Sequence, residues 1–272
     1  MISKKLFQNA ILGLFLSLYA VFLSTALSMA ADKSNIKLGV MEGEEAIIWK
    51  VAVEQAKKDG LNIKLVYFSD YTLPNDAVHA GDIDANAFQH TPYLKNQIEQ
   101  HGYKLSIAGN TFITPIAIYS HKIKDIKELQ NGASVGIPND PSNGARSLFL
   151  LNSLKLIKLK NPHDILASPF DIIENPKNLK IRELDAGILG RAIDDFDIVI
   201  VNTNWALTTG LNLQKDAIAW EKAENNPYNN VIVVRSADKD EPWVKKLVAA
   251  YNSEPVRAKI KEIFGTAAQT SW

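Results

Sequence analysis

The sequence contains no cysteine, carries no excess of charge of either sign and has no apolar run of membrane-spanning length. Without cysteine, disulfide bonds and thiolate chemistry are excluded. Thirty basic and thirty acidic residues give a formal net charge of zero, so nothing in the charge balance favours nucleic acid as a partner. The longest apolar run, residues 10–23, is shorter than the roughly 20 residues that a transmembrane helix needs.

The first 30 residues are typical of a secretory signal peptide. Lys4 and Lys5 precede the apolar run, and small residues at Ser28 and Ala30 offer a cleavage site before Ala31. We therefore expect an exported, periplasmic protein, with an uncleaved N-terminal membrane anchor as the alternative. Because there is no cysteine, we expect no lipid anchor.

The rest of the sequence is that of a globular α/β protein. With 272 residues, of which 46% are hydrophobic and 22% charged, it can bury one large core or two of roughly 100 residues each. Strand and helix patterns alternate in two sets, which predicts parallel sheets with helices on both faces and two lobes. Strands are expected at 36–40, 63–68, 84–88, 116–119, 134–137, 180–184, 198–201 and 230–234, and helices at 46–58, 74–80, 92–100, 143–154, 189–193, 241–251 and 255–264. Residues 159–178 are rich in loops and have no clear assignment.

The stretch from residue 82 to residue 94 has a composition that neither a plain core nor a solvated surface selects. Its strand pattern ends at Thr91-Pro92, which is typical of the N-cap and first position of a helix. Phe88, Gln89 and His90 are therefore expected at the carboxyl end of a strand, where open α/β sheets bind ligands. Taken singly, a Phe is more often a core residue and a lone His more often structural. Together they suit a small molecule with apolar and charged parts.

Polar residues follow two further strands. A helix is expected to begin near Ser142, where its N-terminus would attract an anion, and Arg146 can present a planar fork of donors to a carboxylate. On spacing alone a phosphate fits as well, and a solvated Arg is about as probable as a ligand clamp. Asn202 ends one strand and Asn230 begins another. Their amide groups can donate and accept, which suits a zwitterion, although capping of a helix or turn is the alternative.

Catalytic and metal-binding motifs are missing from the sequence. There is no G-x-S-x-G, no H-E-x-x-H, no P-loop and no G-x-G-x-x-G after the first strand. His79, His90 and His101 recur every 11 residues, but helices broken by Pro92 do not place them on one face, so we expect neither a metal nor another cofactor. A binding protein is favoured over an enzyme or a surface interaction protein.

Several longer motifs occur in a fixed order after the leader. They are Phe68-Ser69-Asp70-Tyr71, Leu73 to Ala77, Gly81 to His90, Gly109 to Phe112, Ile137 to Pro141, Glu174 to Lys180, Val201-Asn202-Thr203, Pro227-Tyr228 and the final Trp272. In this order they resemble the NlpA-type family of methionine-binding proteins that serve ABC importers. The resemblance implies a type II periplasmic binding protein fold, with two α/β lobes joined by a two-strand hinge near Pro115 and Tyr228 and a ligand cleft between them. It implies a signal peptide at 1–30, a first lobe at 31–115 and 228–272, and a second lobe at 116–227.

The same resemblance implies the function and the site. The protein would capture L-methionine, or a close analogue, by lobe closure and deliver it to an ABC importer, that is, a permease with its ATPase, and it would act as a monomer. Another small amino acid or a methionine-containing dipeptide is the alternative ligand. Arg146 would bind the carboxylate, and the full set of expected ligand contacts is Tyr71, Phe88, His90, Tyr93, Arg146, Asn202 and Asn230. Asn204 stands where relatives often have Thr or Gly and is not included. Most family members carry a lipid-modified cysteine after the leader, and this sequence has none.

Overall fold

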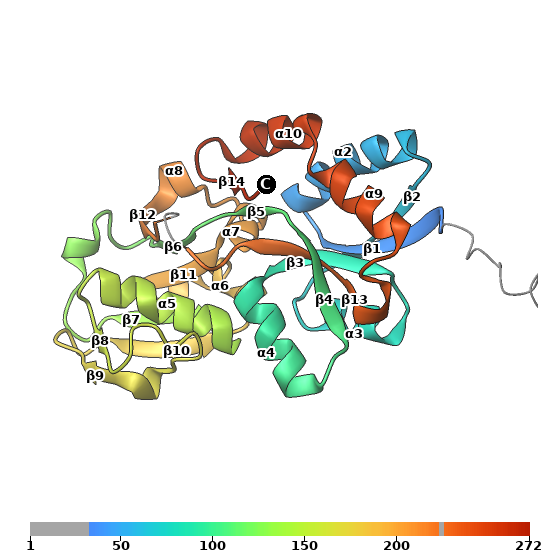
Figure 1. The fold of residues 1–272 in the computed structure, drawn as a ribbon. Helices are drawn as coiled ribbons and strands as arrows, with labels where there is room; N and C mark the ends of the chain where they lie inside the picture. Colours follow the sequence, from blue (N-terminus) through green and yellow to red (C-terminus); the bar gives the residue numbers. More distant parts are fainter. Residues whose placement is uncertain (1–32, 223–225) are drawn as a thin grey trace, which may run out of the picture. The chain divides into compact units, whose positions relative to one another are not determined.

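The computed structural model describes residues 33–222 and 226–272 (Figure 1). The signal peptide expected at 1–30 lies outside these residues. Within the described ranges, none of the helices combines the length and the apolar character that crossing a membrane requires.

The first lobe is built on a five-stranded sheet with the order β2-β1-β3-β13-β4. Its strands are β1 (Asn35–Met41), β2 (Asn62–Phe68), β3 (Ala85–His90), β4 (Leu105–Asn110) and β13 (Asn230–Arg235). β1 pairs in parallel with β2 and β3, whereas β13 lies antiparallel between β3 and β4. The expected parallel arrangement thus holds for β1, β2 and β3 but not for β13, because β13 returns from the second lobe and enters the sheet in the opposite direction.

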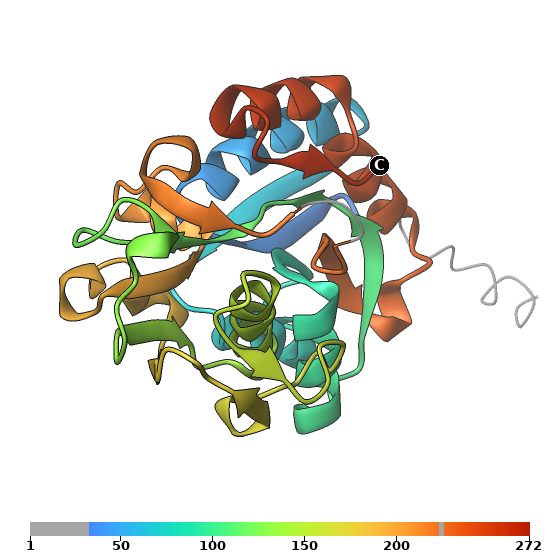
Figure 2. The same ribbon diagram turned by 90° about the vertical axis from the view of Figure 1, so that its left-hand side faces the viewer.

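Helices cover both faces of this sheet because successive side chains of a strand point to opposite sides. Ile232 and Val234 of β13 pack in one cluster with α2 (Glu44–Lys58), α9 (Pro242–Tyr251) and α10 (Glu254–Phe264). These three helices lie together in both ribbon views (Figures 1 and 2). The alternate residues, Val231 and Val233, pack on the other face in a cluster that includes residues of α3 (Leu73–Ala80) and α4 (Thr91–His101).

The second lobe has its own five-stranded sheet, with the order β10-β7-β11-β6-β12. Its strands are β6 (Ile116–Tyr119), β7 (Ser134–Pro138), β10 (Lys180–Leu184), β11 (Ile198–Asn202) and β12 (Ala217–Trp220). β7 is parallel to β10 and β11, and β6 is antiparallel to β11 and β12. This sheet is thus also mixed.

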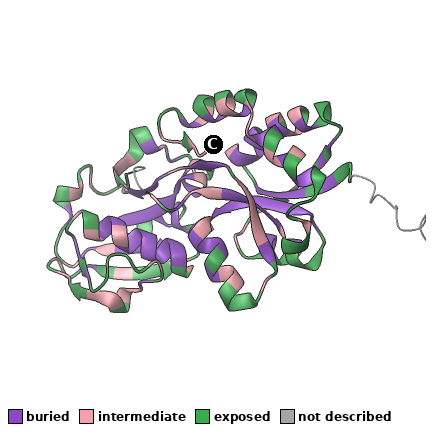
Figure 3. Ribbon diagram, viewed as in Figure 1, coloured by how far each residue is buried: buried purple, intermediate pink, exposed green. Residues whose placement is uncertain are grey.

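Alternation along β11 again assigns the faces of the second sheet. Ile198 and Ile200 pack in a cluster with α5 (Pro141–Ser153). Val199 and Val201 pack in a second cluster, which takes in α6 (Ala186–Leu189) and α7 (Thr203–Thr208) together with Phe88 and Tyr93 of the first lobe. Burial is accordingly concentrated on the strands and the inner faces of the helices (Figure 3).

The remaining elements are short. They are the paired strands β5 (Phe112–Ile113) and β14 (Gln269–Thr270), the paired strands β8 (Lys158–Leu159) and β9 (Ile172–Glu174), helix α8 (Leu213–Asp216), and 3-10 turns at Ile126–Glu128, Pro169–Asp171, Ile193–Asp195 and Ser236–Asp238. The helix expected at 189–193 is wrong, because α6 ends at Leu189 and a separate 3-10 turn begins at Ile193. The chain crosses between the sheets at 111–115 and again between β12 and β13, so the predicted two-lobed α/β fold with two connections is confirmed.

Candidate functional site

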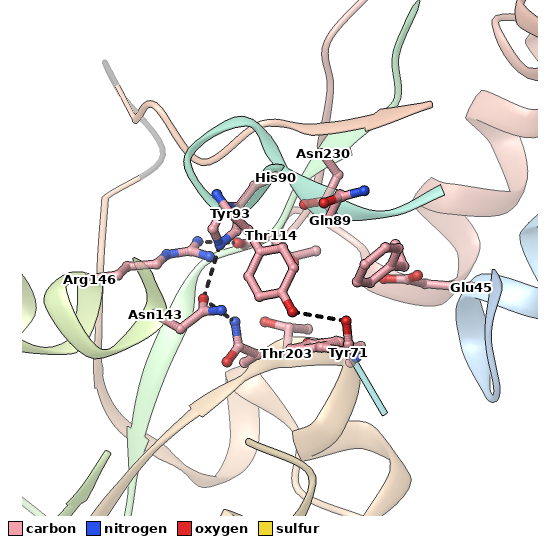
Figure 4. Close-up of a pocket in the computed structure, with 13 residues that line it drawn as sticks. Glu45, Tyr71, Gln89, His90, Tyr93, Thr114, Asn143, Arg146, Thr203 and Asn230 are labelled. Carbon is pink, nitrogen blue, oxygen red and sulfur yellow. Dashed lines mark hydrogen bonds between the residues drawn. The ribbon is translucent and has the colours of Figure 1, made fainter. Parts of the chain in front are cut away.

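A pocket lies where the two lobes meet (Figure 4). The structure brings together all the residues that the sequence indicated, namely Tyr71, Phe88, His90, Tyr93, Arg146, Asn202 and Asn230. The pocket wall also contains residues outside the expected set of ligand contacts, namely Glu45, Gln89, Thr114, Asn143, Thr203 and Asn204.

Three aromatic rings form one wall of the pocket. The ring centroids of Tyr71, Phe88 and Tyr93 are 5.8 to 6.0 Å apart in each pairing, and the Trp205 ring lies 5.4 Å from that of Tyr71. The Tyr93 hydroxyl donates to the Tyr71 carbonyl oxygen at 2.8 Å, and the Tyr71 hydroxyl donates to Asn204 Oδ1 at 2.8 Å. Both hydroxyl protons are thus used within the protein, so the wall presents mainly ring carbon to a ligand.

His90 is a neutral side chain that links the lobes. It is the N-cap of α4, where Thr91 was expected, because its Nδ1 accepts a hydrogen bond from the Tyr93 N–H at 3.1 Å. Since Nδ1 is an acceptor, Nε2 carries the proton and donates to Asn143 Oδ1 at 3.1 Å. Burial, with a smaller effect from the nearby Arg146 charge, lowers the pKa of His90 to about 3. His90 is therefore uncharged at neutral pH.

Asn143 connects His90 to the second lobe. Its Oδ1 also accepts from Asn202 Nδ2 at 2.8 Å, and its Nδ2 donates to the Asp140 carboxylate at 3.0 and 3.1 Å. Asp140 in turn caps α5 by accepting from the Asn143 N–H at 2.9 Å and from the Ser142 hydroxyl at 2.8 Å. The N-terminus of α5 was expected to attract an anion from solution, but the Asp140 carboxylate already occupies that place as the N-cap.

Asn202 offers an acceptor to the pocket. Its Oδ1 is buried and has no hydrogen-bond partner in the described part of the chain. A buried acceptor without a partner carries a desolvation cost that a ligand N–H would remove. Asn230, the first residue of β13, pairs in register with His90 and so lies beside it at the same edge of the sheet.

Arg146 is already part of an internal ion pair. Its Nε donates to both carboxylate oxygens of Glu221 at 3.0 and 3.1 Å, and its Nη2 donates to Glu221 Oε1 and to the Thr114 carbonyl oxygen, the latter at 2.8 Å. The guanidinium carbon lies 4.4 Å from the centroid of the Tyr228 ring. The Nε and Nη2 donors of the fork that was expected to bind a ligand carboxylate are thus already paired with Glu221. Nη1 is the part of the fork for which the described residues provide no hydrogen-bond partner.

Glu45 is the second acidic feature that sequence reasoning missed. It lies in the first turn of α2, is 6% exposed and forms no hydrogen bond or ion pair within the described residues. Burial, with a smaller contribution from the adjacent Glu44, raises the pKa of Glu45 to about 8. Nothing in the sequence around Glu45 marks it as a pocket residue, because the pattern there is that of an ordinary amphipathic helix.

The recurring histidines are not brought together. His79 and His101 each lie 5.1 Å from the ring of Tyr103, whereas His90 lies in the pocket. Across residues 33–222 and 226–272, no group of three side chains of His, Cys, Asp or Glu is placed to hold a metal ion.

Comparison with known proteins identifies the family of this two-lobed chain. Residues 36–272 match the family described as NlpA lipoprotein. The chain belongs to the NlpA lipoprotein family. It is 49% identical to the D-methionine-binding lipoprotein MetQ of Escherichia coli (strain K12), over 89% of this chain and 90% of that protein.

Two solved structures of binding proteins resemble this NlpA family member in fold and sequence. A nutrient binding protein from Burkholderia cenocepacia bound to methionine is 48% identical, with a TM-score of 0.85 over 87% of this chain and 100% of the other. A periplasmic substrate-binding protein of an ABC transporter from Coxiella burnetii is 44% identical, with a TM-score of 0.83 over 87% and 100% of the two chains. The expected periplasmic binding protein fold is confirmed, and the NlpA relatives are named as binding proteins and not as enzymes.

One expectation about this NlpA family member is wrong. We expected an exported protein without a lipid anchor, whereas the family and the E. coli relative are both named lipoproteins. The inference from the missing cysteine is corrected by these comparisons.

Proposed function

We propose that this protein binds methionine, as L-methionine or a close analogue, between its two lobes and delivers it to an ABC importer. The observation that carries the proposal is the pocket, where an aromatic wall faces buried polar groups. Support comes from 48% identity to a solved structure that contains methionine. The permease with its ATPase would be the partner, and the binding protein would act as a monomer.

We assign the ligand contacts to the residues that the sequence indicated. The thioether side chain would pack against Tyr71, Phe88 and Tyr93, because sulfur makes favourable contacts of about 0.3–1.5 kcal/mol with aromatic rings. Arg146 would bind the ligand carboxylate through Nη1, and Asn202 Oδ1 would accept from the ligand ammonium. His90 and Asn230 would complete the polar wall.

The mechanism would be closure of the lobes around the ligand. Hydrogen bonds already cross between the lobes in this structure, among them those from Tyr71 to Asn204, from His90 to Asn143 and from Arg146 to the Thr114 carbonyl oxygen. A ligand that contacts both lobes stabilises this closed arrangement over an open one, and the closed form would be what the permease recognises. We propose lobe boundaries at 31–115 with 228–272 and at 116–227.

Mass spectrometry of the ligand released from the purified, denatured protein tests the proposal, followed by calorimetry with added amino acids. We expect methionine, with norleucine roughly tenfold weaker because it keeps the shape and loses the sulfur, which is about 1.4 kcal/mol. Valine and glutamate should bind far more weakly. Titration of both enantiomers of methionine will define the stereochemical preference. A protein that prefers glutamate or a phosphonate over methionine would overturn the proposal.

A further inference from the structure

Glu45 is a pocket residue that the proposed contacts with methionine leave without a role. Among the residues that line the pocket, it alone carries a carboxyl group. It is more than nine-tenths buried, and within the described residues it has no hydrogen-bond or ion-pair partner. A buried carboxyl group without a partner is costly in either protonation state, and most of all when ionised. The presence of this carboxyl group in the pocket wall therefore indicates that it has a role in ligand binding.

Glu45 and Arg146 lie on opposite sides of the pocket, with the Tyr93 ring between them in the view of Figure 4. Arg146 is the cation of the pocket wall, so the proposed function places the α-carboxylate of the ligand at that side. The far end of an extended ligand, which is its side chain, then points to the side on which Glu45 lies.

We propose that Glu45 is a specificity-determining residue that selects ligands by the charge at the end of their side chain. As the neutral acid it admits an uncharged thioether. As the carboxylate it disfavours the thioether and favours a side chain of similar shape that carries a positive charge, such as a sulfonium. This inference rests on the proposed function and adds to it the control of which side chains the pocket accepts.

The surroundings of Glu45 favour the neutral acid near neutral pH. Glu44 of the same helix adds a like charge, and the tyrosines that interact with Glu45 electrostatically are Tyr71, from the loop before α3, and Tyr251 of α9. The Tyr71 hydroxyl proton is donated to Asn204 of α7, so it is not directed at Glu45. The Tyr251 hydroxyl is buried without a hydrogen-bond partner in the described residues. None of these groups supplies a positive charge that would hold Glu45 in its ionised form.

The direction of the pH effect follows from linkage. Burial raises the pKa of Glu45 to about 8, so the empty pocket loses this proton as the pH rises through that value. If the thioether complex requires the neutral acid, methionine binding takes up a proton above this pH and its affinity falls, by up to roughly tenfold per pH unit. Binding of a sulfonium has the opposite linkage and releases a proton below this pH.

The experiment compares L-methionine with its S-methyl sulfonium derivative on the wild-type protein and on Glu45→Gln, which keeps the size of the side chain but does not titrate. Dissociation constants are measured from about pH 6.5 to about pH 9.5, a range that spans the titration of Glu45. Relative to Glu45→Gln, wild-type affinity for methionine should fall roughly tenfold over the last pH unit, whereas affinity for the sulfonium should rise from about pH 6.5 to about pH 8 and then level off. The α-amino group of the ligand titrates equally in both proteins, so it cancels in this comparison.

Calorimetry of the wild-type protein in buffers of different ionisation enthalpy gives a second measurement that needs no variant. At about pH 8, methionine should take up about half a proton and the sulfonium should release about half a proton. Identical proton counts for the two ligands, or parallel pH profiles for wild type and Glu45→Gln, would overturn the role of Glu45 while leaving methionine binding intact. A wild-type protein that binds no methionine at all would instead overturn the proposed function, and this inference with it.

Discussion

Replacing Arg146 by alanine should lower the free energy of unfolding of the protein and also weaken its binding of methionine. The side chains of Arg146 and Glu221 are 4% and 13% exposed, so the pair is shielded from water. Arg146→Ala would leave the Glu221 carboxylate with the Ile116 N–H, which donates to it at 3.0 Å, as its remaining hydrogen-bond partner in the described residues. Removing one partner of a buried ion pair costs about 3–5 kcal/mol of unfolding free energy, because the other charge stays buried.

This loss is large compared with the roughly 5–15 kcal/mol by which domains are stable. For a chain of this size, 1 kcal/mol corresponds to about 2–4 °C in melting temperature, so Arg146→Ala should melt roughly 6–20 °C below wild type. Methionine affinity should fall by about 2–5 kcal/mol, as expected when one partner of a charged contact is truncated.

The assay is thermal and urea unfolding followed by tryptophan fluorescence, with Glu221→Ala and the double variant Arg146→Ala/Glu221→Ala as controls. The double variant should recover part of the stability that Arg146→Ala loses, because it leaves no uncompensated buried charge. A single variant that melts within about 2 °C of wild type would show that the pair does not stabilise the fold, contrary to the reasoning from burial.

Three further predictions concern the pocket. Tyr71→Phe removes the hydroxyl that bridges to Asn204 and keeps the ring, so methionine affinity in calorimetry should fall by about 0.5–1.5 kcal/mol; a loss well above this range would mean that the hydroxyl contacts the ligand. Asn202→Ala removes an acceptor for a charged ligand group and should cost about 1.5–3 kcal/mol of affinity; unchanged affinity would remove Asn202 from the site. Folding lowers the pKa of His90 from about 6.5 in the unfolded chain to about 3. Between about pH 6.5 and about pH 3, the unfolded chain therefore binds one proton more than the folded protein. The resulting stability is present above about pH 6.5 and is lost at about 1.4 kcal/mol per unit as the pH falls, and urea unfolding of His90→Gln should lack this slope.

The sequence was informative where local patterns decide the structure. The alternation of strands and helices predicted four of the five strands of each sheet to within a few residues, but it missed β4, β12 and helix α7. The polar residues at strand ends, such as His90 and Asn202, do meet in one pocket. Local patterns could not reveal that β13 inserts antiparallel between β3 and β4, because strand direction depends on a connection that passes through the other lobe.

The contacts that the sequence did not reveal are those between distant segments. Glu221 is far along the chain from Arg146, and Glu45 lies in the pocket because α2 of the first lobe is in contact with α7 of the second lobe. The N-cap of α4 was placed at Thr91 because threonine is a common cap, but the imidazole of His90 performs that role. Such contacts depend on tertiary packing and leave no periodic trace in the sequence.

The position of β13 affects the order in which the protein can fold as it is synthesised. β3 and β4 leave the ribosome early, but the strand that separates them is made only after the whole second lobe, whose sheet is continuous in sequence from β6 to β12. Until β13 arrives, the facing edges of β3 and β4 have unpaired backbone groups, and such edges are prone to pair with other chains. The second lobe can therefore complete its sheet while the nascent chain is still short, whereas the first lobe must wait for residues near the C-terminus. A chain truncated before Asn230 should accordingly aggregate through its first lobe even though its second lobe is complete.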